Sequence, residues 1–203
     1  MKWPAFFGIA ALAIWLYLLL GRGGFWRARE HDDRDSVPNL AHWPAVTAVV
    51  PARNEADVIG QSIGNLLQQD YPGTFRVVLV DDNSEDGTAA RALEAAGGAP
   101  GRLEVLRGAP LPAGWTGKIW AQRQGIRHAT SVTDPPKYLL LTDADIGHAP
   151  DNLRRLVERA ESQGLSLYSL MAELSCQRDR KSTRLNSSHV SNLVCRLLLE
   201  KKK

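Results

Sequence analysis

The sequence contains little cysteine, and its main part has no excess of positive charge. Its 203 residues include only Cys176 and Cys195, too few and too late in the chain for a disulfide framework. The formal net charge of +3 belongs to the end of the chain, because residues 177–203 carry +6 and residues 1–176 carry −3. The body therefore gives no case for nucleic-acid binding.

A phosphate-binding P-loop is also missing. The segment PAGWTGKIWA contains Gly117 and Lys118, but a P-loop would need glycine at 112 and serine or threonine at 119. This chain has Pro112 and Ile119 at those positions. Lys118 opens a predicted helix, and a lysine beside a helix N-terminus can still meet a phosphate group.

One long apolar run stands at the start of the chain. Residues 4–20 contain no charged residue, and their length is at the short end of what spans a bilayer. A cleaved signal peptide and a buried helix are the alternatives, but no small-residue cleavage site follows. Residues 1–26 are therefore predicted to form an N-terminal transmembrane helix. Three arginines follow it closely, which predicts that the next domain lies in the cytoplasm.

Short apolar segments alternate with helical patterns after a charged, proline-containing linker at 27–45. Strands are predicted at 46–50, 75–80, 102–106, 138–141 and 165–174. The alternation predicts an α/β domain over residues 46–176, with a mostly parallel sheet and flanking helices. The pattern stops near residue 177, and residues 177–203 are predicted to be a non-native or disordered tail.

Polar motifs follow the predicted strands. In an open parallel sheet, ligands bind beyond the carboxyl ends of the strands, and four motifs fall there. They are VPARNEAD (50–57), VDDNSEDGT (80–88), PAGWTGK (112–118) and TDADIG (142–147). Each alone is also typical of a helix start or an Asx turn, and Pro51 is expected to end the first strand. Together, and in this order, they predict a ligand site.

Asp143 and Asp145 are two residues apart, directly after the apolar segment 138–141. Two carboxylates this close repel each other unless a cation lies between them. A hard divalent ion such as Mg²⁺ or Mn²⁺ suits carboxylate oxygens, so these residues are candidate metal ligands. A solvated loop without a ligand is the alternative.

Three residues near these motifs have ordinary structural interpretations. His148 follows the aspartates, and a surface position is predicted for it rather than metal ligation. Trp115 and Trp120 are interpreted as packing residues, with a platform for an acceptor molecule as the alternative.

The four motifs in this order resemble the nucleotide-sugar-binding half of inverting family 2 glycosyltransferases, which have the Rossmann-like GT-A fold. The start of the chain and the segment 106–121 resemble, more narrowly, the hopanoid-biosynthesis-associated glycosyltransferases. The resemblance covers about residues 5–176. It implies transfer of a sugar from a nucleotide-diphosphate sugar, expected to be a UDP-sugar, to a lipid-type acceptor. It also implies location at the bacterial inner membrane.

The resemblance also implies roles for particular residues. The implied nucleotide-binding residues are Pro51, Arg53, Glu55, Val80, Asp82, Lys118, Asp143 and Ala144. Among them, Asp82 matches the residue that reads the base, and Lys118 a basic position near the nucleotide or its phosphates. The implied metal ligand is Asp145, with Asp143 beside it, and the implied cofactor is Mg²⁺ or Mn²⁺. The metal would bridge the diphosphate and offset charge on the leaving group.

The catalytic base remains unknown from the sequence. Family members supply an aspartate base from a later segment, and nothing after Glu173 matches it. The resemblance therefore implies a C-terminally truncated member in which the base, the acceptor region and further membrane helices are missing.

Two other functions fit part of the pattern. A phosphatase of the haloacid-dehalogenase type also has an Asp-x-Asp pair after a buried strand, but near the start of its fold and followed by threonine. Here Ile146 and Gly147 follow the pair, which comes fourth among the motifs. The other alternative is a membrane-anchored nucleotide-binding module without catalysis. Turnover of a sugar nucleotide would separate an enzyme from such a module.

Overall fold

The structure is a computed structural model that describes residues 3–21, 40–97, 101–169, 175–176, 189–190 and 196–198. The chain divides into two compact units, Met1–Ser36 and Val37–Lys203. The first contains helix α1 (Trp3–Leu16) and the π-helical turn η1 (Tyr17–Gly21).

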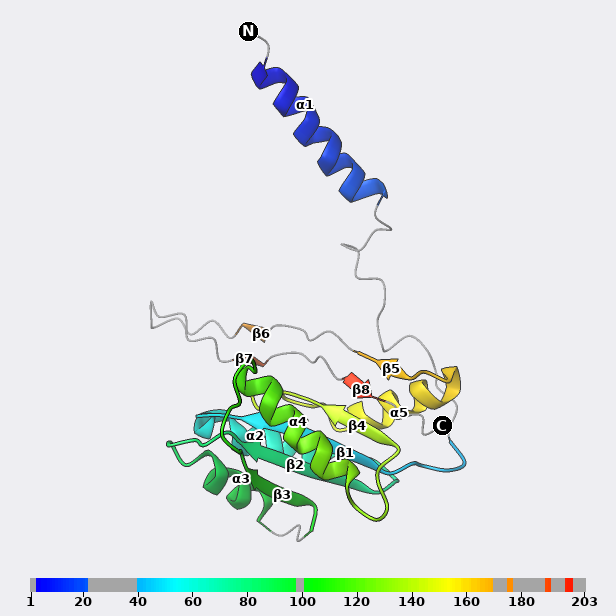
Figure 1. Cartoon of the computed structure of the whole chain (residues 1–203). Helices are drawn as coiled ribbons and strands as arrows, with labels where there is room; N and C mark the ends of the chain where they lie inside the picture. Colours follow the sequence, from blue (N-terminus) through cyan, green and yellow to red (C-terminus); the bar gives the residue numbers. More distant parts are fainter. Residues whose placement is uncertain are drawn as a thin grey trace. The chain divides into compact units, whose positions relative to one another are not determined.

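Strands and helices alternate along the second unit (Figure 1). Its strands are β1 (Val46–Ala52), β2 (Phe75–Asp81), β3 (Leu103–Arg107), β4 (Tyr138–Leu141), β5 (Leu167–Tyr168), β6 (Ser175–Cys176), β7 (His189–Val190) and β8 (Arg196–Leu198). Its helices are α2 (Ala56–Leu67), α3 (Thr88–Ala96), α4 (Gly117–Thr130) and α5 (Asn152–Gln163).

The main sheet has the strand order β3-β2-β1-β4-β8-β5. Its first four strands are parallel, because β1 pairs in parallel with both β2 and β4, and β2 with β3. Strand β8 is antiparallel to both β4 and β5. The prediction of an α/β domain with a mostly parallel sheet is confirmed. The carboxyl ends of the four parallel strands consequently lie along one edge, where such sheets bind ligands.

Helices cover the two faces of the sheet differently. In β1, Val46, Ala48 and Val50 belong to a core cluster shared with α2, α3 and α5, whereas Val49 packs with residues of α4. This alternation has the period of two expected for a strand that is buried on both faces. Helix α4 lies on the face of the sheet opposite the shared core cluster (Figure 1), so its start can reach the carboxyl edge of the sheet.

Helix α4 lies close to the sheet because its buried positions are small. These positions, spaced four apart, are Ala121, Gly125 and Ala129. A Cβ atom at Gly125 would lie 2.4 Å from Val49 Cγ1 and 2.9 Å from Val80 Cγ2, closer than carbon atoms can pack. Glycine at this position therefore determines how near the helix, and with it the helix start, lies to β1 and β2.

The expectation that Pro51 ends the first strand is wrong, because β1 continues to Ala52. Pairing of β1 with β4 ends at Val49 opposite Leu141, and the Thr142 N–H donates to the Val49 carbonyl. Backbone groups of alternate residues point to the same neighbour, so the nitrogen of Pro51 points toward β4 beyond the last pair. A proline is tolerated there because no hydrogen bond is lost.

The predicted transmembrane helix is not found. Helix α1 has 14 residues and gives way to the π-helical turn at Tyr17. In the part of the chain that the structure describes, no helix is long and apolar enough to cross a membrane. Helix α1 is nevertheless apolar on every side, and Phe6, Phe7 and Trp15 are each about two-thirds exposed.

The predicted domain boundaries stay predictions. Most of the linker at 27–45 and most of the tail at 177–203 lie outside the described residues, although β7 and β8 belong to the tail segment. Of the fifth predicted strand, 165–174, Leu167 and Tyr168 form β5, and residues 170–174 lie outside the described residues.

Candidate active site

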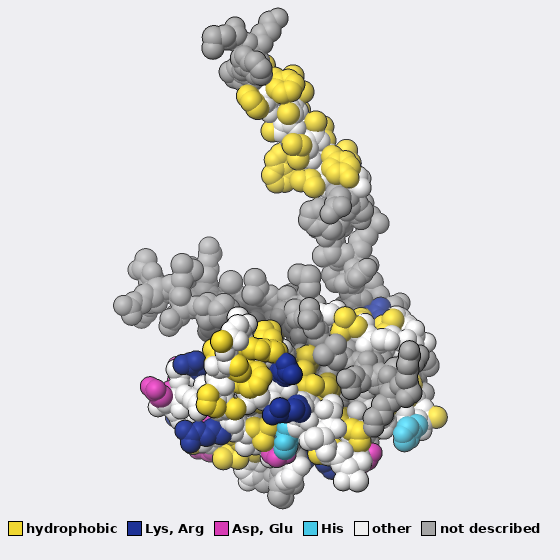
Figure 2. Space-filling view, viewed as in Figure 1, with side chains coloured by type: hydrophobic (Ala, Val, Ile, Leu, Met, Phe, Trp, Pro, Cys, Tyr) yellow, Lys and Arg dark blue, Asp and Glu magenta, His cyan; other side chains and the backbone are white. Residues whose placement is uncertain are grey.

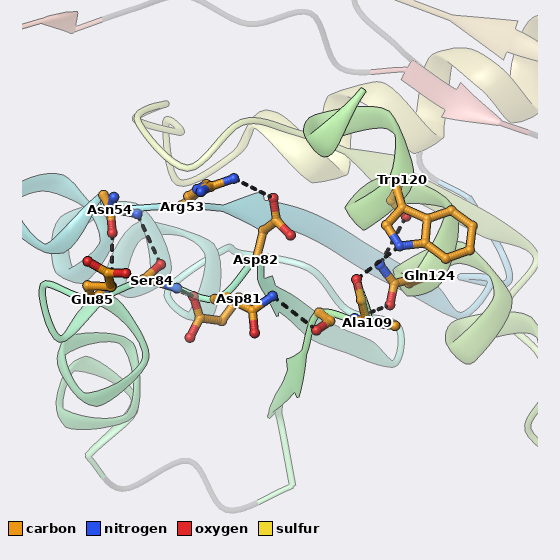
Figure 3. A network of polar contacts seen from close by, with 11 residues as sticks. Arg53, Asn54, Asp81, Asp82, Ser84, Glu85, Ala109, Trp120 and Gln124 are labelled. Carbon is orange, nitrogen blue, oxygen red and sulfur yellow. Dashed lines mark hydrogen bonds and ion pairs between the residues drawn. The ribbon is translucent and has the colours of Figure 1, made fainter. Parts of the chain in front are cut away.

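Asn54 joins the turn after β1 to the loop after β2. Its backbone N–H donates to Ser84 Oγ at 3.0 Å, and its Oδ1 accepts the N–H of Glu85 at 3.0 Å (Figure 3). Asn54 has a φ of 56°, a left-handed conformation that asparagine adopts more readily than most residues. The turn chemistry predicted for the β2 loop thus connects two strand ends that are neighbours in the sheet.

The β2 loop and the first residue of α3 supply the caps of helix α2. Its own N-cap residue, Glu55, makes no side-chain cap bond. Instead the Glu55 N–H donates to Thr88 Oγ1 at 2.9 Å, and the Ala56 N–H donates to Asp86 Oδ2 at 2.9 Å. The Thr88 hydroxyl donates to Asp86 Oδ1, and this bond, followed by that from Ala56, holds the pKa of Asp86 below its ordinary value. Protein groups thus already use the Asp86 carboxylate.

The two aspartates at the end of β2 have different surroundings. Asp81 Oδ1 accepts the backbone N–H of Ser84, three residues later, at 3.0 Å, and so closes a local turn. Asp82 is only 8% exposed, and its Oδ2 lies 3.6 Å from Arg53 Nη1 (Figure 3). A Cβ at Gly117 would come within 3.0 Å of Asp82 Oδ2, and one at Gly108 within 3.2 Å of Oδ1. Asp82 therefore occupies a narrow space between the β1 tip and the start of α4.

The segment after β4 alternates between buried and partly exposed residues. Asp143 and Asp145 are partly exposed, and the residues between and around them are buried: Thr142, Ala144, Ile146 and His148. Both aspartates therefore face the surface, while the residues next to them point into the protein. The Ala144 side chain packs into the core cluster shared with α2 and α5.

Charged groups from two other elements act on these aspartates. Lys118 Nζ, from the first turn of α4, lies 2.7 Å from Asp143 Oδ1. The pKa of Glu55 is raised, first by burial and then by the negative charges of Asp145, Asp86 and Asp143. Groups from the tip of β1, the tip of β4 and the start of α4 are therefore within electrostatic reach of one another.

These residues fit a divalent cation that takes further ligands from a substrate. Asp143 and Asp145 are two partly exposed carboxylates close together in the chain, and after burial, which is the main cause, their charges also raise the pKa of Glu55. Within the described ranges, no group of three or more His, Cys, Asp or Glu side chains could hold a metal by itself. Mg²⁺ is commonly bound by one or two carboxylates together with substrate phosphates, which matches this set.

His148 is buried, so the surface position predicted for it is wrong. It is 6% exposed, and burial lowers its pKa to about 4. The Asn152 side-chain amide donates to His148 Nδ1 at 3.1 Å, so Nε2 of the neutral ring carries the proton and donates to Thr142 Oγ1 at 3.0 Å. The ring connects the end of β4 to the start of α5 and supports the segment that carries the aspartates.

Trp115 and Trp120 pack edge to face in the loop before α4 and in its first turns, with ring centroids 5.4 Å apart. Trp120 Nε1 donates to the Ala109 carbonyl at 3.1 Å, and Gln124 Oε1 accepts the Ala109 N–H at 2.8 Å (Figure 3). These contacts agree with the packing interpretation and fasten the loop beside Asp82.

A cavity of about 200 Å³ lies away from these residues. It is at the amino ends of the strands, where its lining includes Thr47, Arg76 and Arg102 together with His128 of α4. None of the predicted site residues lines it. We therefore locate the candidate site by the meeting of charged groups at the carboxyl edge rather than by cavity volume.

The predicted site residues separate into two groups in the structure. The charged members lie at the tips of β1, β2 and β4 and at the start of α4: Arg53, Glu55, Asp82, Lys118, Asp143 and Asp145. The three others are buried beneath: Pro51 and Val80, which are partners in the β1–β2 register, and Ala144. Sequence reasoning missed Asn54, Asp86 and Thr88, because their partners are about 30 residues away along the chain.

The chain belongs to glycosyl transferase family 2, because the model of that family matches residues 47–197. Two curated relatives are similar over most of the same domain. The succinoglycan biosynthesis protein ExoO of Rhizobium meliloti is 37% identical over 131 residues, which are 64% of this chain and 34% of that protein. The β-monoglucosyldiacylglycerol synthase of Synechocystis is 35% identical over 129 residues, or 62% of this chain and 24% of that protein. The chain thus spans about a third or less of either relative.

A solved structure shows the same architecture. It is the mannosyltransferase PcManGT from Pyrobaculum calidifontis in complex with GDP-Man and Mn²⁺. The TM-score is 0.52 at 28% identity, and the match covers 87% of this chain and 46% of the mannosyltransferase. The fold is accordingly a GT-A-like α/β fold, with four parallel strands flanked by helices.

Proposed function

We propose that this chain is the donor-binding part of a glycosyltransferase that moves a sugar from a nucleotide-diphosphate sugar to a lipid acceptor, with a divalent cation. The observation that carries the proposal is the meeting of Asp82, Lys118, Asp143 and Asp145 at one edge of the sheet. Family membership supports it, and so does the GDP-Man and Mn²⁺ complex of the similar mannosyltransferase.

Asp82 is proposed to bind the nucleoside. Its carboxylate is nearly buried, and a carboxylate is an acceptor only, so it suits the N–H of a base or a ribose hydroxyl. Arg53 lies beside it, with a side chain that is 66% exposed and can turn toward a bound nucleotide. Pro51 and Val80 pack beneath these groups and form a rigid support. We propose UDP as the nucleotide to test first and GDP as the second.

Lys118, Asp143 and Asp145 are proposed to face the diphosphate. Lys118 adds its charge at the start of α4, where the N-terminal backbone N–H groups also favour anions. Asp143 orients the Lys118 ammonium and lies where it can accept from the ribose or the sugar, beside the Ala144 backbone. A divalent cation on Asp145 and Asp143 would supply Lewis-acid stabilisation of the charge on the leaving nucleoside diphosphate.

The lipid acceptor and the membrane location rest on different observations. A relative is named for its product, a glucosylated diacylglycerol. Helix α1 is apolar on all sides, and such a helix is normally buried in protein or lipid. We propose attachment to a bacterial inner membrane through residues 1–26, with the domain on the cytoplasmic side. The resemblance to hopanoid-associated enzymes makes hopanoid-related lipids the first acceptors to test. We assign no general base among the described residues.

Calorimetric titration of UDP and GDP in the presence of Mn²⁺ tests the donor site. Replacing Asp82 by Asn removes the carboxylate that binds the nucleoside and should weaken binding by about 1–3 kcal/mol. Asp81→Asn is the matched control, since an asparagine oxygen can still accept the Ser84 N–H and the affinity should stay that of the wild type. Equal affinities of the folded Asp82→Asn variant and the wild type would remove Asp82 from the site.

A further inference from the structure

Residues 105–133 form the longest stretch of the domain in which all charges have one sign. They contain Arg107, Lys118, Arg123 and Arg127 and no aspartate or glutamate. This contrasts with the net charge of −3 over residues 1–176. The stretch comprises the end of β3, the loop that follows it and the whole of α4. This continuous segment of the domain therefore carries positively charged side chains and no acidic ones.

Two large apolar side chains of this stretch are exposed. Leu111 in the loop and Ile119 in the first turn of α4 are each 52% exposed. Ile119, Arg123 and Arg127 are exposed and spaced four apart, so they form one stripe along the helix. We call Leu111, Trp115, Ile119, Arg123 and Arg127 the α4 ridge.

Contacts within the α4 ridge combine aromatic and basic groups. The Arg123 guanidinium lies 4.8 Å from the centroid of the Trp115 ring, a cation–π contact. Trp115 packs in turn on Trp120, whose indole nitrogen is bonded to the loop, so the group is held in place. Figure 2 shows hydrophobic side chains gathered on the face where α4 lies, with lysine and arginine side chains among them.

We propose that the α4 ridge docks on the surface of a membrane that contains anionic lipids. Tryptophan and exposed Leu and Ile side chains enter the interfacial region of a bilayer, and arginines bind anionic headgroups. Lys118, on the same first turn as Ile119, contacts Asp143. Docking would therefore present the donor site to the lipid surface, and in this respect the inference rests on the proposed lipid acceptor.

Charge favours a membrane over a second copy of the chain. A symmetric dimer contact places the same patch on both partners, which would bring the arginines of one ridge against those of the other. Like charges in such a contact repel each other, whereas an anionic lipid surface attracts every charged residue of the ridge.

The test uses the whole 203-residue chain with Cys176→Ser and Cys195→Ser and a single new cysteine that carries an environment-sensitive fluorophore. The cysteine replaces Leu111 in the ridge or, as a matched control, Leu93, which lies on α3 and is similarly exposed at 55%. Each protein is mixed with phosphatidylcholine vesicles, with or without phosphatidylglycerol, that contain spin-labelled lipid. The label at 111 should shift to the blue and lose most of its fluorescence on the anionic vesicles, and the label at 93 should not.

Charge reversal sharpens the result. Combining Arg123→Glu with Arg127→Glu should bring quenching of the label at 111 down to that at 93, and added salt should act in the same direction. Absence of vesicle binding, or equal quenching at both positions, overturns the proposal. A blue shift without vesicles that grows with protein concentration also overturns it, in favour of self-association.

Nucleotide affinity measured in solution on the same proteins separates this inference from the proposed function. Normal nucleotide binding without quenching at 111 rejects only the docking surface. Quenching at 111 in a chain that binds no nucleotide rejects the donor site and leaves the membrane contact standing.

Discussion

Two acidic loops at the same edge of the sheet use their carboxylates differently. In the loop after β2, Asp81 and Asp86 accept hydrogen bonds from nearby backbone N–H groups. In the segment after β4, Asp143 binds the Lys118 ammonium across the edge, and both Asp143 and Asp145 raise the pKa of Glu55. The hydrogen bonds of the first loop hold the protein together, although the Asp86 charge also raises the pKa of Glu55, whereas Asp143 of the second faces an ammonium group of another element.

The difference shows why acidity at a strand end is weak evidence for a ligand site. A carboxylate that caps a helix or closes a turn has its acceptor capacity used by the protein. Within the β2 loop, Asp82 is the exception, because it is nearly buried and faces Arg53 and the glycines near α4 instead of closing a turn. We therefore propose ligand binding for Asp82, Asp143 and Asp145, and a supporting role for Asp81 and Asp86.

The largest expected effect concerns the support of the β4 segment. The pKa of His148 falls from 6.5 to about 4 on folding, so the unfolded chain binds the proton more readily between those values. Stability supplied by the neutral ring is present above pH 6.5 and is lost as the pH falls toward 4, by about 3 kcal/mol in all. Urea unfolding at a series of pH values should show this decline, and His148→Gln should flatten it. Equal pH dependence in both proteins would contradict the assignment.

A smaller effect is expected for the support of the β2 loop. Thr88→Val keeps the shape of the buried side chain but leaves the Glu55 N–H without its acceptor, which should cost about 1–3 kcal/mol of folding stability. Thr116→Val is the matched control, because Thr116 starts α4 without a side-chain cap bond, and its loss should cost less than about 0.5 kcal/mol. Thermal unfolding of both variants measures the difference. Similar losses at the two positions would show that the β2 loop is not specially held.

The smallest expected effect concerns Glu55, which is influenced by carboxylates of both loops. Its pKa is raised in the folded state, first by burial and then by these charges. A carboxyl group with a raised pKa contributes stability below its ordinary pKa and loses that contribution as the pH rises through the raised value. Glu55→Gln should therefore be slightly more stable than the wild type at pH 7, with the advantage disappearing in acid. A variant that is less stable than the wild type at pH 7 would show that burial and the nearby carboxylates do not destabilise the ionised Glu55 side chain.

Much of the fold could be predicted from the sequence, because apolar segments such as 75–80 and 138–141 mark strands directly. The position of the aspartate pair at a strand end could be predicted as well, because both residues follow the apolar segment that forms β4. The bonds of Asn54 and Thr88 could not be predicted, because they depend on β1 and β2 lying side by side. The burial of His148 could not be predicted either, because it depends on how the segment after β4 folds against the start of α5, where the ring meets Asn152.

The most direct test of the account is a calorimetric titration of nucleoside diphosphate with and without Mn²⁺. The wild type should bind more tightly with Mn²⁺, because the ion lowers the repulsion between the diphosphate and the two aspartates. Asp145→Asn should lose most of this gain, Asp143→Asn should lose less of it, and the exposed Asp57→Asn, in the first turn of α2, should keep it. Binding by the wild type that does not depend on the metal would contradict the central claim.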